Sequence, residues 1–139
     1  MVFEKHRGSV CLTTDTWTSI QNINYMCLTA HYVDESWNLK KKIINFCQIF
    51  SHKGELIGKM VERCLLSWGI TNVFTITVDN ASANDVGIRF LKRRLRTWGI
   101  SLLDGEHLHM RCGAHILNLV VRDGLDENKA TISRIRAAV

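Results

Sequence analysis

VFTITVDNASAND, from Val73 to Asp85, is the stretch on which the interpretation of the whole chain rests. Its first half is apolar and rich in β-branched and aromatic residues, a composition typical of a short buried strand. The strand pattern stops at Asp79, and the residues after it favour turns and helix starts. In α/β folds ligands gather at the carboxyl ends of strands. Asp79 is therefore a candidate site residue.

A second carboxylate occupies a similar position upstream. Asp15 lies near the end of VCLTTDTW, residues 10–17, which is another apolar, Thr-rich run. The two acids can share a metal ion only if their strands are neighbours in the sheet. The alternative is structural, with Asp15 in a turn and Asp79 as a helix-capping acid, and the pattern alone leaves both interpretations open.

Composition narrows the class of protein. The chain has 139 residues, of which 46% are hydrophobic and 22% charged, which predicts one globular domain. A net charge of +5 weakly favours an anionic partner. The five cysteines are scattered and mostly inside apolar runs, which favours reduced core thiols in an intracellular protein. The sequence contains neither a membrane-length apolar run nor a signal peptide.

The first third of the chain predicts a meander of three antiparallel strands, because the links between the strand candidates are short and polar. The candidates are residues 10–17, 25–33 and 43–50.

The rest of the chain alternates helices and strands. A helix over residues 55–68 ends at Gly69, and a second helix starts near residue 82 or 84 and ends at Trp98 before Gly99. A short strand over residues 106–111 follows. The remaining predicted elements are a helix at 113–124, apolar nearly all round and therefore expected to be buried, and the start of a further helix at 126–139.

The resulting order, β-β-β-α-β-α-β-α, predicts an α/β fold of the ribonuclease H-like class with a mixed sheet. In that topology the first and fourth strands lie side by side and parallel. Asp15 and Asp79 would then meet at adjacent carboxyl ends.

Four motifs, in order, resemble the catalytic core of plant hAT-superfamily transposases of the RICESLEEPER type, which carry a BED zinc finger. The resemblance runs from about Val10 to Leu125. The motifs are LTTDTWTS (12–19), NYMCLTAHYVDESW (24–37), TVDNASAND (77–85) and RCGAHILNLVVRDGL (111–125).

The resemblance implies a ribonuclease H-like core that cuts and rejoins DNA with divalent Mg²⁺ or Mn²⁺. Asp15 matches the first catalytic acid of the family, and Asp79 matches the second. The resemblance implies that both acids are also metal ligands. Cys112 and His115 match a C-x-x-H motif that works close to the DNA ends. In the parent family the protein is also a possible homo-oligomer.

The chain departs from the family pattern in what it lacks. The third acid of the family, a glutamate, follows a long helical insertion, and neither is present in the sequence. The BED zinc finger and the dimerisation region are also missing. We therefore expect one partial core over residues 1–139, truncated before the insertion domain, with a meander at 10–50 and an α/β part at 54–125. Such a chain should bind the metal weakly or not at all and be inactive alone.

A compact H-x-H-x-x-C-x-x-H pattern offers a different metal site. His107 and His109 would share one face of a strand, and Cys112 and His115 are one helical turn apart. Tetrahedral zinc sites usually join two well-separated pairs of ligands. Ordinary surface or core histidines are therefore the favoured interpretation.

A basic helix face is the candidate nucleic-acid surface. Arg89, Lys92, Arg93 and Arg96 cluster opposite the apolar stripe of the second helix and could contact phosphates. The alternative is an ordinary solvated face. Trp17, two residues after Asp15, is the one tryptophan that we consider a candidate neighbour of the site.

These observations predict a nuclear, DNA-binding fragment of a hAT-type transposase core. We expect it to bind DNA non-specifically through phosphates and not to bind a membrane. One alternative is a domesticated nuclear DNA-binding or protein-interaction module without catalysis. Another is a ribonuclease H-like nuclease, for which Asp123 and Asp126 are the only later acids near a helix that could serve.

Overall fold

The computed structural model describes residues 3, 6–51, 53–100 and 102–138. Its element order matches the predicted order, with one short 3₁₀ helix added. The elements are β1 (Val10–Thr18), β2 (Asn24–Val33), β3 (Leu39–Ile49), α1 (Gly54–Trp68), β4 (Val73–Val78), α2 (Ser82–Trp98), η1 (Leu102–Gly105), β5 (His109–Arg111), α3 (Gly113–Glu127) and α4 (Lys129–Ala137).

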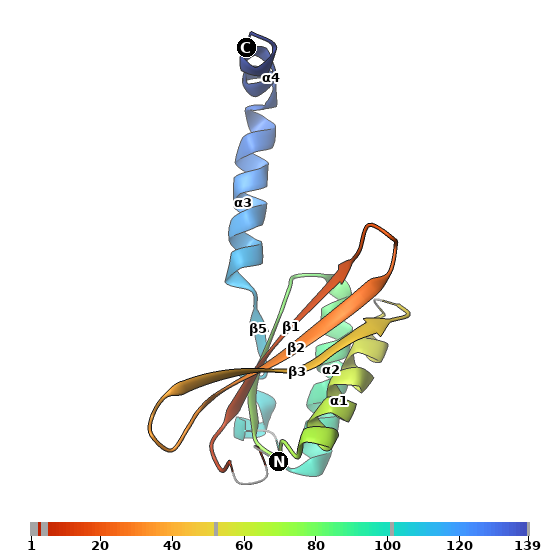
Figure 1. Cartoon of the computed structure of the whole chain (residues 1–139), viewed down its shortest axis with the longest axis vertical. Helices are drawn as coiled ribbons and strands as arrows, with labels where there is room; N and C mark the ends of the chain where they lie inside the picture. Colours follow the sequence, from red (N-terminus) through yellow and green to blue (C-terminus); the bar gives the residue numbers. More distant parts are fainter. Residues whose placement is uncertain (1–2, 4–5, 52, 101, 139) are drawn as a thin grey trace.

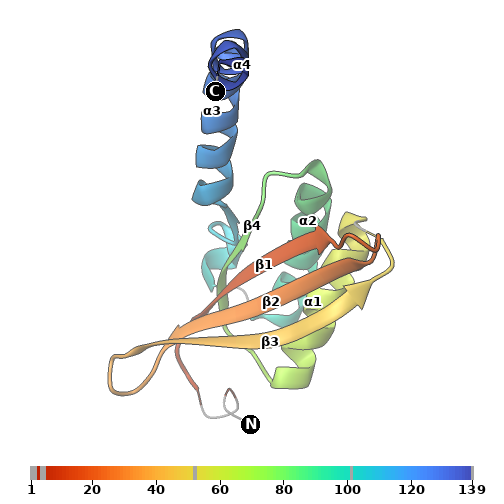
Figure 2. The same ribbon diagram turned by 45° about the horizontal axis from the view of Figure 1, so that its top comes forward.

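The strands form one mixed sheet in the order β3-β2-β1-β4-β5 (Figures 1 and 2). β1 pairs antiparallel with β2, and β2 antiparallel with β3. β4 runs parallel to β1 on one side and to β5 on the other. The predicted mixed α/β architecture, with the first and fourth strands adjacent and parallel, is confirmed.

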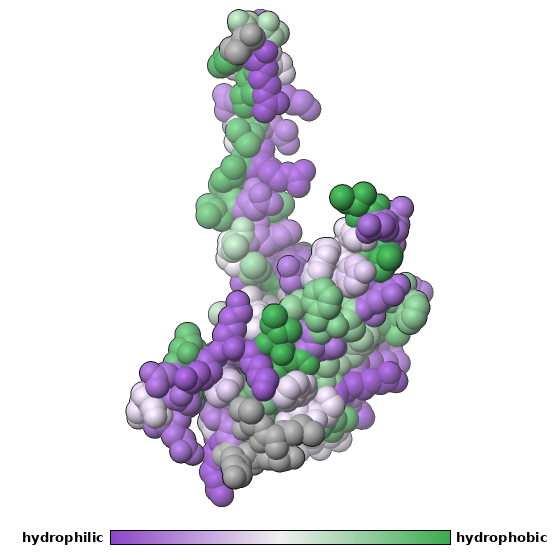
Figure 3. Space-filling view, viewed as in Figure 1, coloured by the Kyte–Doolittle hydropathy of each residue, from purple (hydrophilic) through white to green (hydrophobic). Residues whose placement is uncertain are grey.

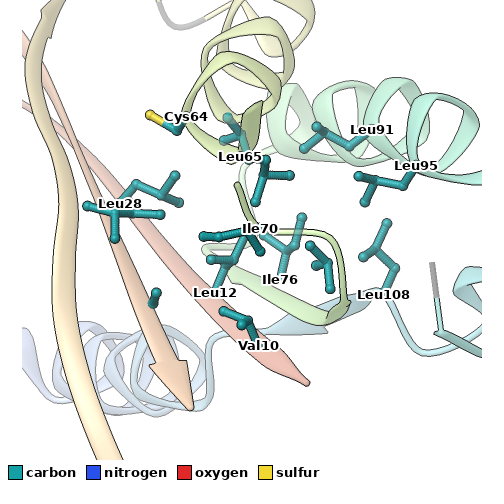
Figure 4. Packing of buried hydrophobic residues seen from close by; sticks show 14 of the residues in the cluster. Val10, Leu12, Leu28, Cys64, Leu65, Ile70, Ile76, Leu91, Leu95 and Leu108 are labelled. Atoms are coloured by element: carbon teal, nitrogen blue, oxygen red, sulfur yellow. The ribbon is translucent and has the colours of Figure 1, made fainter. Parts of the chain in front are cut away.

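α1 and α2 lie together on one face of this sheet (Figure 2). Alternate residues of the strands point into the layer between sheet and helices. Leu12 and Ile76, from the two parallel strands, are completely buried there, and Leu95 of α2 is equally inaccessible. Figure 4 shows these side chains converging with those of Leu65 and Leu91.

The two helices approach closely through glycines. A Cβ atom built on Gly54 would lie 1.8 Å from the carbonyl oxygen of Ala83, and one on Gly87 would lie 2.8 Å from the carbonyl oxygen of Gly54. The helices therefore touch backbone to backbone where both begin. Each helix ends as predicted, at Gly69 and Gly99, which adopt left-handed φ angles of 65° and 67°.

All five cysteines are free thiols, but only Cys64 is buried. Burial, the largest cause, raises the pKa of this thiol, so it stays protonated near neutral pH. The prediction of core thiols therefore holds for Cys64, whereas the other four cysteines are only partly buried.

The third strand begins earlier than the sequence predicted, at Leu39 instead of Ile43. The cause is the tight hairpin before it, in which Oδ1 of Asp34 accepts hydrogen bonds from the backbone N–H groups of Ser36 and Asn38. Lys40 also pairs with Asp34 at 3.1 Å. The charged run that looked like a link is therefore strand.

α3 contradicts the prediction of burial. It extends away from the sheet, and the structure buries none of its residues (Figure 1). Its apolar side chains form hydrophobic patches along its length (Figure 3). Apolarity on every side predicts that a helix has partners, but not that these partners are in the same described chain. None of the described helices has both the length and the apolar run needed to cross a membrane.

The helix contact can be tested with two glycine substitutions. Gly54→Ala should lower the free energy of unfolding by about 1–3 kcal/mol or more, because its methyl group meets backbone atoms that cannot move aside. Gly124→Ala is the matched control, because nothing lies within 4 Å of the added atom. Urea unfolding of both variants is the measurement. Equal stabilities would show that the helices do not meet at Gly54.

Candidate functional site

Asp15 and Asp79 lie on neighbouring parallel strands. The last registered pair between β1 and β4 joins Thr13 to Thr77, and each acid stands two residues further along its own strand. Because side chains alternate with a period of two, both acids project on the face of the sheet opposite α1 and α2. Both line one cleft of about 420 Å³ at the carboxyl ends of the strands.

The Asp79 carboxylate is held in place through one of its oxygens. Oδ1 accepts hydrogen bonds from the backbone N–H of Ala81 at 2.9 Å and from Nδ2 of Asn84 at 2.6 Å. Asn84 is 7% exposed, so the second bond is sheltered from water. No described residue donates a hydrogen bond to Oδ2. Asp79 therefore has a fixed orientation and one oxygen available to a ligand.

The Asp15 carboxylate is exposed, and within the described ranges it forms no hydrogen bond or ion pair. Its neighbour Thr13 lines the same cleft and lies 3.1 Å from Nε2 of His31, measured from the threonine hydroxyl. Burial and, to a smaller degree, the charge of Lys41 lower the pKa of His31. The neutral imidazole is thus favoured beside the cleft.

The start of α3 completes the cleft. The backbone N–H of Cys112 donates to the carbonyl oxygen of Val78 at 2.9 Å, which places the amino end of α3 next to the end of β4. Cys112, His115 and Asn118 all line the cleft. The unpaired N–H groups and positive dipole of a helix amino end attract anions such as phosphate.

The fold therefore brings together the two candidate acids and the two residues of the C-x-x-H motif. Asp15, Asp79, Cys112 and His115, although spread over 101 positions of the chain, border one cavity.

The chemistry of the donors partly suits a divalent cation. Two carboxylates that face one cleft are hard oxygen ligands of the kind that Mg²⁺ and Mn²⁺ prefer. The thiol of Cys112 and the imidazole of His115 favour softer metals. Among the residues with described placement, no group of three or more His, Cys, Asp or Glu is arranged to hold a metal. The cleft thus presents two carboxylates from the described residues.

The histidine-rich pattern is divided between separate places. Nδ1 of His109 lies 3.9 Å from Oδ1 of Asp85, and His107 packs edge-on against the ring of Phe74. Cys112 and His115 face the cleft instead. Asp123 and Asp126, which the nuclease alternative would use, lie on the exposed part of α3.

Two residues of α2 lie against the β5 side of the sheet. Asp85 comes within 3.9 Å of His109 in β5, and Arg96 forms an ion pair with Asp104 in η1. Arg96 also donates to the carbonyl oxygen of Asp104. Arg93 instead acts electrostatically on Glu55 of α1. In the described part of the chain, Arg89, Lys92 and Arg93 form no ion pair.

The four basic residues therefore differ in their suitability for phosphate contact. Arg89 is the nearest of them along the helix to the cleft. Arg96 lies roughly 20 Å from the start of α2 at 1.5 Å per residue, and its charge is already compensated.

Sequence reasoning missed Asn84 as a residue that positions Asp79. The available signal was its place, five residues after the acid on the apolar side of an amphipathic helix. A polar side chain at such a position is buried and needs a partner.

The sequence was also compared with known proteins. A model of the ZBED1 RNase-like domain matches residues 13–107, a range that includes both acids and stops before Cys112. A maize (Zea mays) protein named as an AC transposase is 39% identical over 130 residues, which cover 91% of this chain and 16% of the relative.

Two further relatives carry names of the zinc finger BED domain-containing type. RICESLEEPER 2 of rice (Oryza sativa subsp. japonica) is 29% identical over 99% of this chain and 19% of its own length. DAYSLEEPER of Arabidopsis thaliana is 29% identical over 86% of this chain and 17% of its own length. The chain thus spans less than a fifth of these relatives. No solved structure matches it.

The role of Asn84 can be tested by a double-mutant cycle. Asn84→Ala should lower the free energy of unfolding by about 1.5–3 kcal/mol, because it removes a sheltered hydrogen bond to a charged group. In an Asp79→Ala background the same change should cost clearly less, since the partner is gone. Chemical denaturation of the four proteins is the measurement. Additive losses would mean that Asn84 stabilises α2 independently of Asp79.

Proposed function

The chain belongs to the family of the ZBED1 RNase-like domain, and from this premise we propose that it is a DNA-binding segment of a hAT-type transposase core. The observation that carries the proposal is the convergence of Asp15, Asp79, Cys112 and His115 on one cleft at the carboxyl ends of parallel strands. Its relatives named as transposases and zinc finger BED proteins support a transposase-related or domesticated protein.

The DNA contact that we propose is non-specific and electrostatic. The net charge of +5 favours an anionic polymer, and Arg89, Lys92 and Arg93 present charges without an ion-pair partner in the described chain. The amino end of α3 adds anion-binding N–H groups at the cleft. Phosphate contacts of this kind position a protein on DNA without reading its sequence.

The chemistry that we propose for the parent protein is metal-dependent cleavage and strand transfer. In this chain Asp15 and Asp79 would hold a divalent cation, which supplies Lewis-acid activation of a phosphoryl oxygen or water when bound. The protein's own contribution is to orient Asp79 through Asn84 and to present Asp15 unpaired.

A domesticated, non-catalytic nuclear protein is the second candidate. The observation that favours it is that only two carboxylates line the described cleft, whereas two-metal phosphoryl transfer needs several shared ligands. In either case we propose a location in the nucleus, where the DNA is.

The DNA contact predicts a specific salt dependence. The chain should bind duplex DNA of any sequence, and the log–log slope of affinity against salt should fall by about 1.8 in the double variant Arg89→Ala, Arg93→Ala if both touch phosphate. Arg63→Ala with Arg134→Ala is the matched control, because these exposed residues lie on α1 and α4. Fluorescence anisotropy between 50 and about 200 mM salt measures it. If the slope falls equally in both double variants, the basic residues of α2 form an ordinary solvated face with no particular role in binding DNA.

The acid pair predicts that the isolated chain does not cut DNA. Two carboxylates cannot fix both ions needed for in-line displacement, so plasmid DNA should remain supercoiled in the presence of Mn²⁺. Nicking that disappears in Asp79→Asn would contradict this expectation and favour the nuclease alternative.

A further inference from the structure

Two cysteines and two methionines gather between α1 and the outer part of the sheet, and we call them the sulfur cluster. Met26 of β2 is paired with Cys47 of β3, so their side chains share one face of the sheet. Cys47 and Met60 of α1 both pack against the small buried group that contains Met26. Cys64 follows Met60 by four positions, which places both on one face of the helix.

One side-chain amide joins the two thiols of the sulfur cluster. Nδ2 of Asn45 donates a hydrogen bond to Sγ of Cys47 at 3.4 Å. Burial raises the pKa of Cys64 most, the nearby charge of Cys47 raises it further, and a hydrogen bond from Asn45 lowers it. Both sulfur atoms therefore contact the same amide, and the two thiols are neighbours across the interface between β3 and α1.

Packing of an apolar core does not account for Asn45. This residue is half-buried and is paired with Leu28, whose side chain lies in the layer between the sheet and the helices. Sulfur-containing side chains fill gaps in many protein interiors without any polar partner. An amide that donates to sulfur instead favours the negatively charged form of a thiol. In metal sites, hydrogen bonds of this kind orient the ligands and tune the metal.

The sulfur cluster is accessible to a small ion from one side. β3 is the outer strand of the sheet and Cys47 is only half-buried, so an ion can enter from the β3 edge. Cys64, 8% exposed, lies on the inner side. Figure 4 shows its sulfur atom on the side of α1 away from Leu91 and Leu95 of α2.

We propose that the sulfur cluster binds a soft monovalent cation, Cu(I), through the thiolates of Cys47 and Cys64 and the thioether of Met60. Cysteine and methionine sulfur atoms select Cu(I) among the first-row metals. Zinc sites need four ligands, and among the residues whose placement is described no three His, Cys, Asp or Glu side chains are arranged around one metal. The bound cation offsets the charge of two sheltered thiolates and holds β3 against α1.

This site is separate from the acid-lined cleft. Cys27 lines the cleft, and its partner in β3 is Phe46. Cys47 is the next residue along β3, so its side chain points to the opposite face of the sheet. The inference therefore goes beyond the proposed DNA contact and does not depend on it.

The test is a titration of the reduced, oxygen-free chain with Cu(I) supplied by a coloured chelator. The protein should remove about one Cu(I) per chain from the chelator, with the same stoichiometry in native mass spectrometry. Cys47→Ser and Cys64→Ala should each lose this equivalent. Asn45→Leu should weaken binding by about 10- to 100-fold, because it removes a hydrogen bond to the ligands. The thermal unfolding temperature should rise with Cu(I) in the wild type but not in Cys47→Ser.

Cys11 provides the matched control. It is also a half-buried cysteine of a strand, but it lies on β1, outside the sulfur cluster. Cys11→Ser should therefore take up Cu(I) as the wild type does. If Cys64→Ala does not fold, the Cys47→Ser variant still decides the result, because Cys47 is only half-buried.

Three outcomes would overturn the inference. One is the absence of Cu(I) uptake, and another is uptake that persists unchanged in Cys47→Ser, which would place the ion elsewhere in the chain. The third is a chain that takes up no Cu(I) but in which hydrogen peroxide, reduced to water, oxidises Cys47 and Cys64 to a disulfide. That result would assign the pair to redox chemistry. None of the three bears on DNA binding, which is measured separately.

Discussion

The parallel pairing of β1 with β4 is the constraint on which the rest of the structure depends. Two parallel strands need a crossover between them, and here the chain returns through β2, β3 and α1 before it reaches β4. Because both strands run in the same direction, their carboxyl ends meet at one edge of the sheet. Asp15 and Asp79 are neighbours for this reason alone, although 64 positions separate them.

Both sides of the sheet contribute to this arrangement. On the covered side, the glycine contact between α1 and α2 lets the helices pack closely enough to bury Leu12 and Ile76 completely. On the open side, the same strands present Thr13, Asp15 and Trp17 in alternation with those buried residues. Because side chains in β1 alternate with a period of two, one set of residues stabilises the core and the other set faces the candidate site.

Much of this could be predicted from sequence, since it follows from local patterns. The change from strand period to helix period gave the element order, and that order implied the adjacency of Asp15 and Asp79 that the structure has. Helix ends at Gly69 and Gly99 were predictable because only glycine adopts the left-handed conformation without strain.

The features that sequence could not supply depend on contacts between distant residues. The ion pair of Arg96 with Asp104 and the anchoring of Asp79 by Asn84 require the folded arrangement of β4, α2 and η1. The mutual ring contacts of Trp17, Tyr25 and Phe46 depend on the register of three strands, and the sequence pattern pointed only to Trp17. The exposure of α3 was mispredicted because an apolar sequence indicates a need for partners without identifying them.

The central claim is that Asp15 and Asp79 act as one cation site, and paramagnetic NMR tests it most directly. Mn²⁺ added in small amounts to the ¹⁵N-labelled chain broadens amide signals near the ion. The account predicts that signals of Asp15, Asp79 and Cys112 broaden first, and that Asp79→Asn suppresses the effect. Broadening that begins at Asp123 and Asp126 on α3, unchanged in Asp79→Asn, would contradict it.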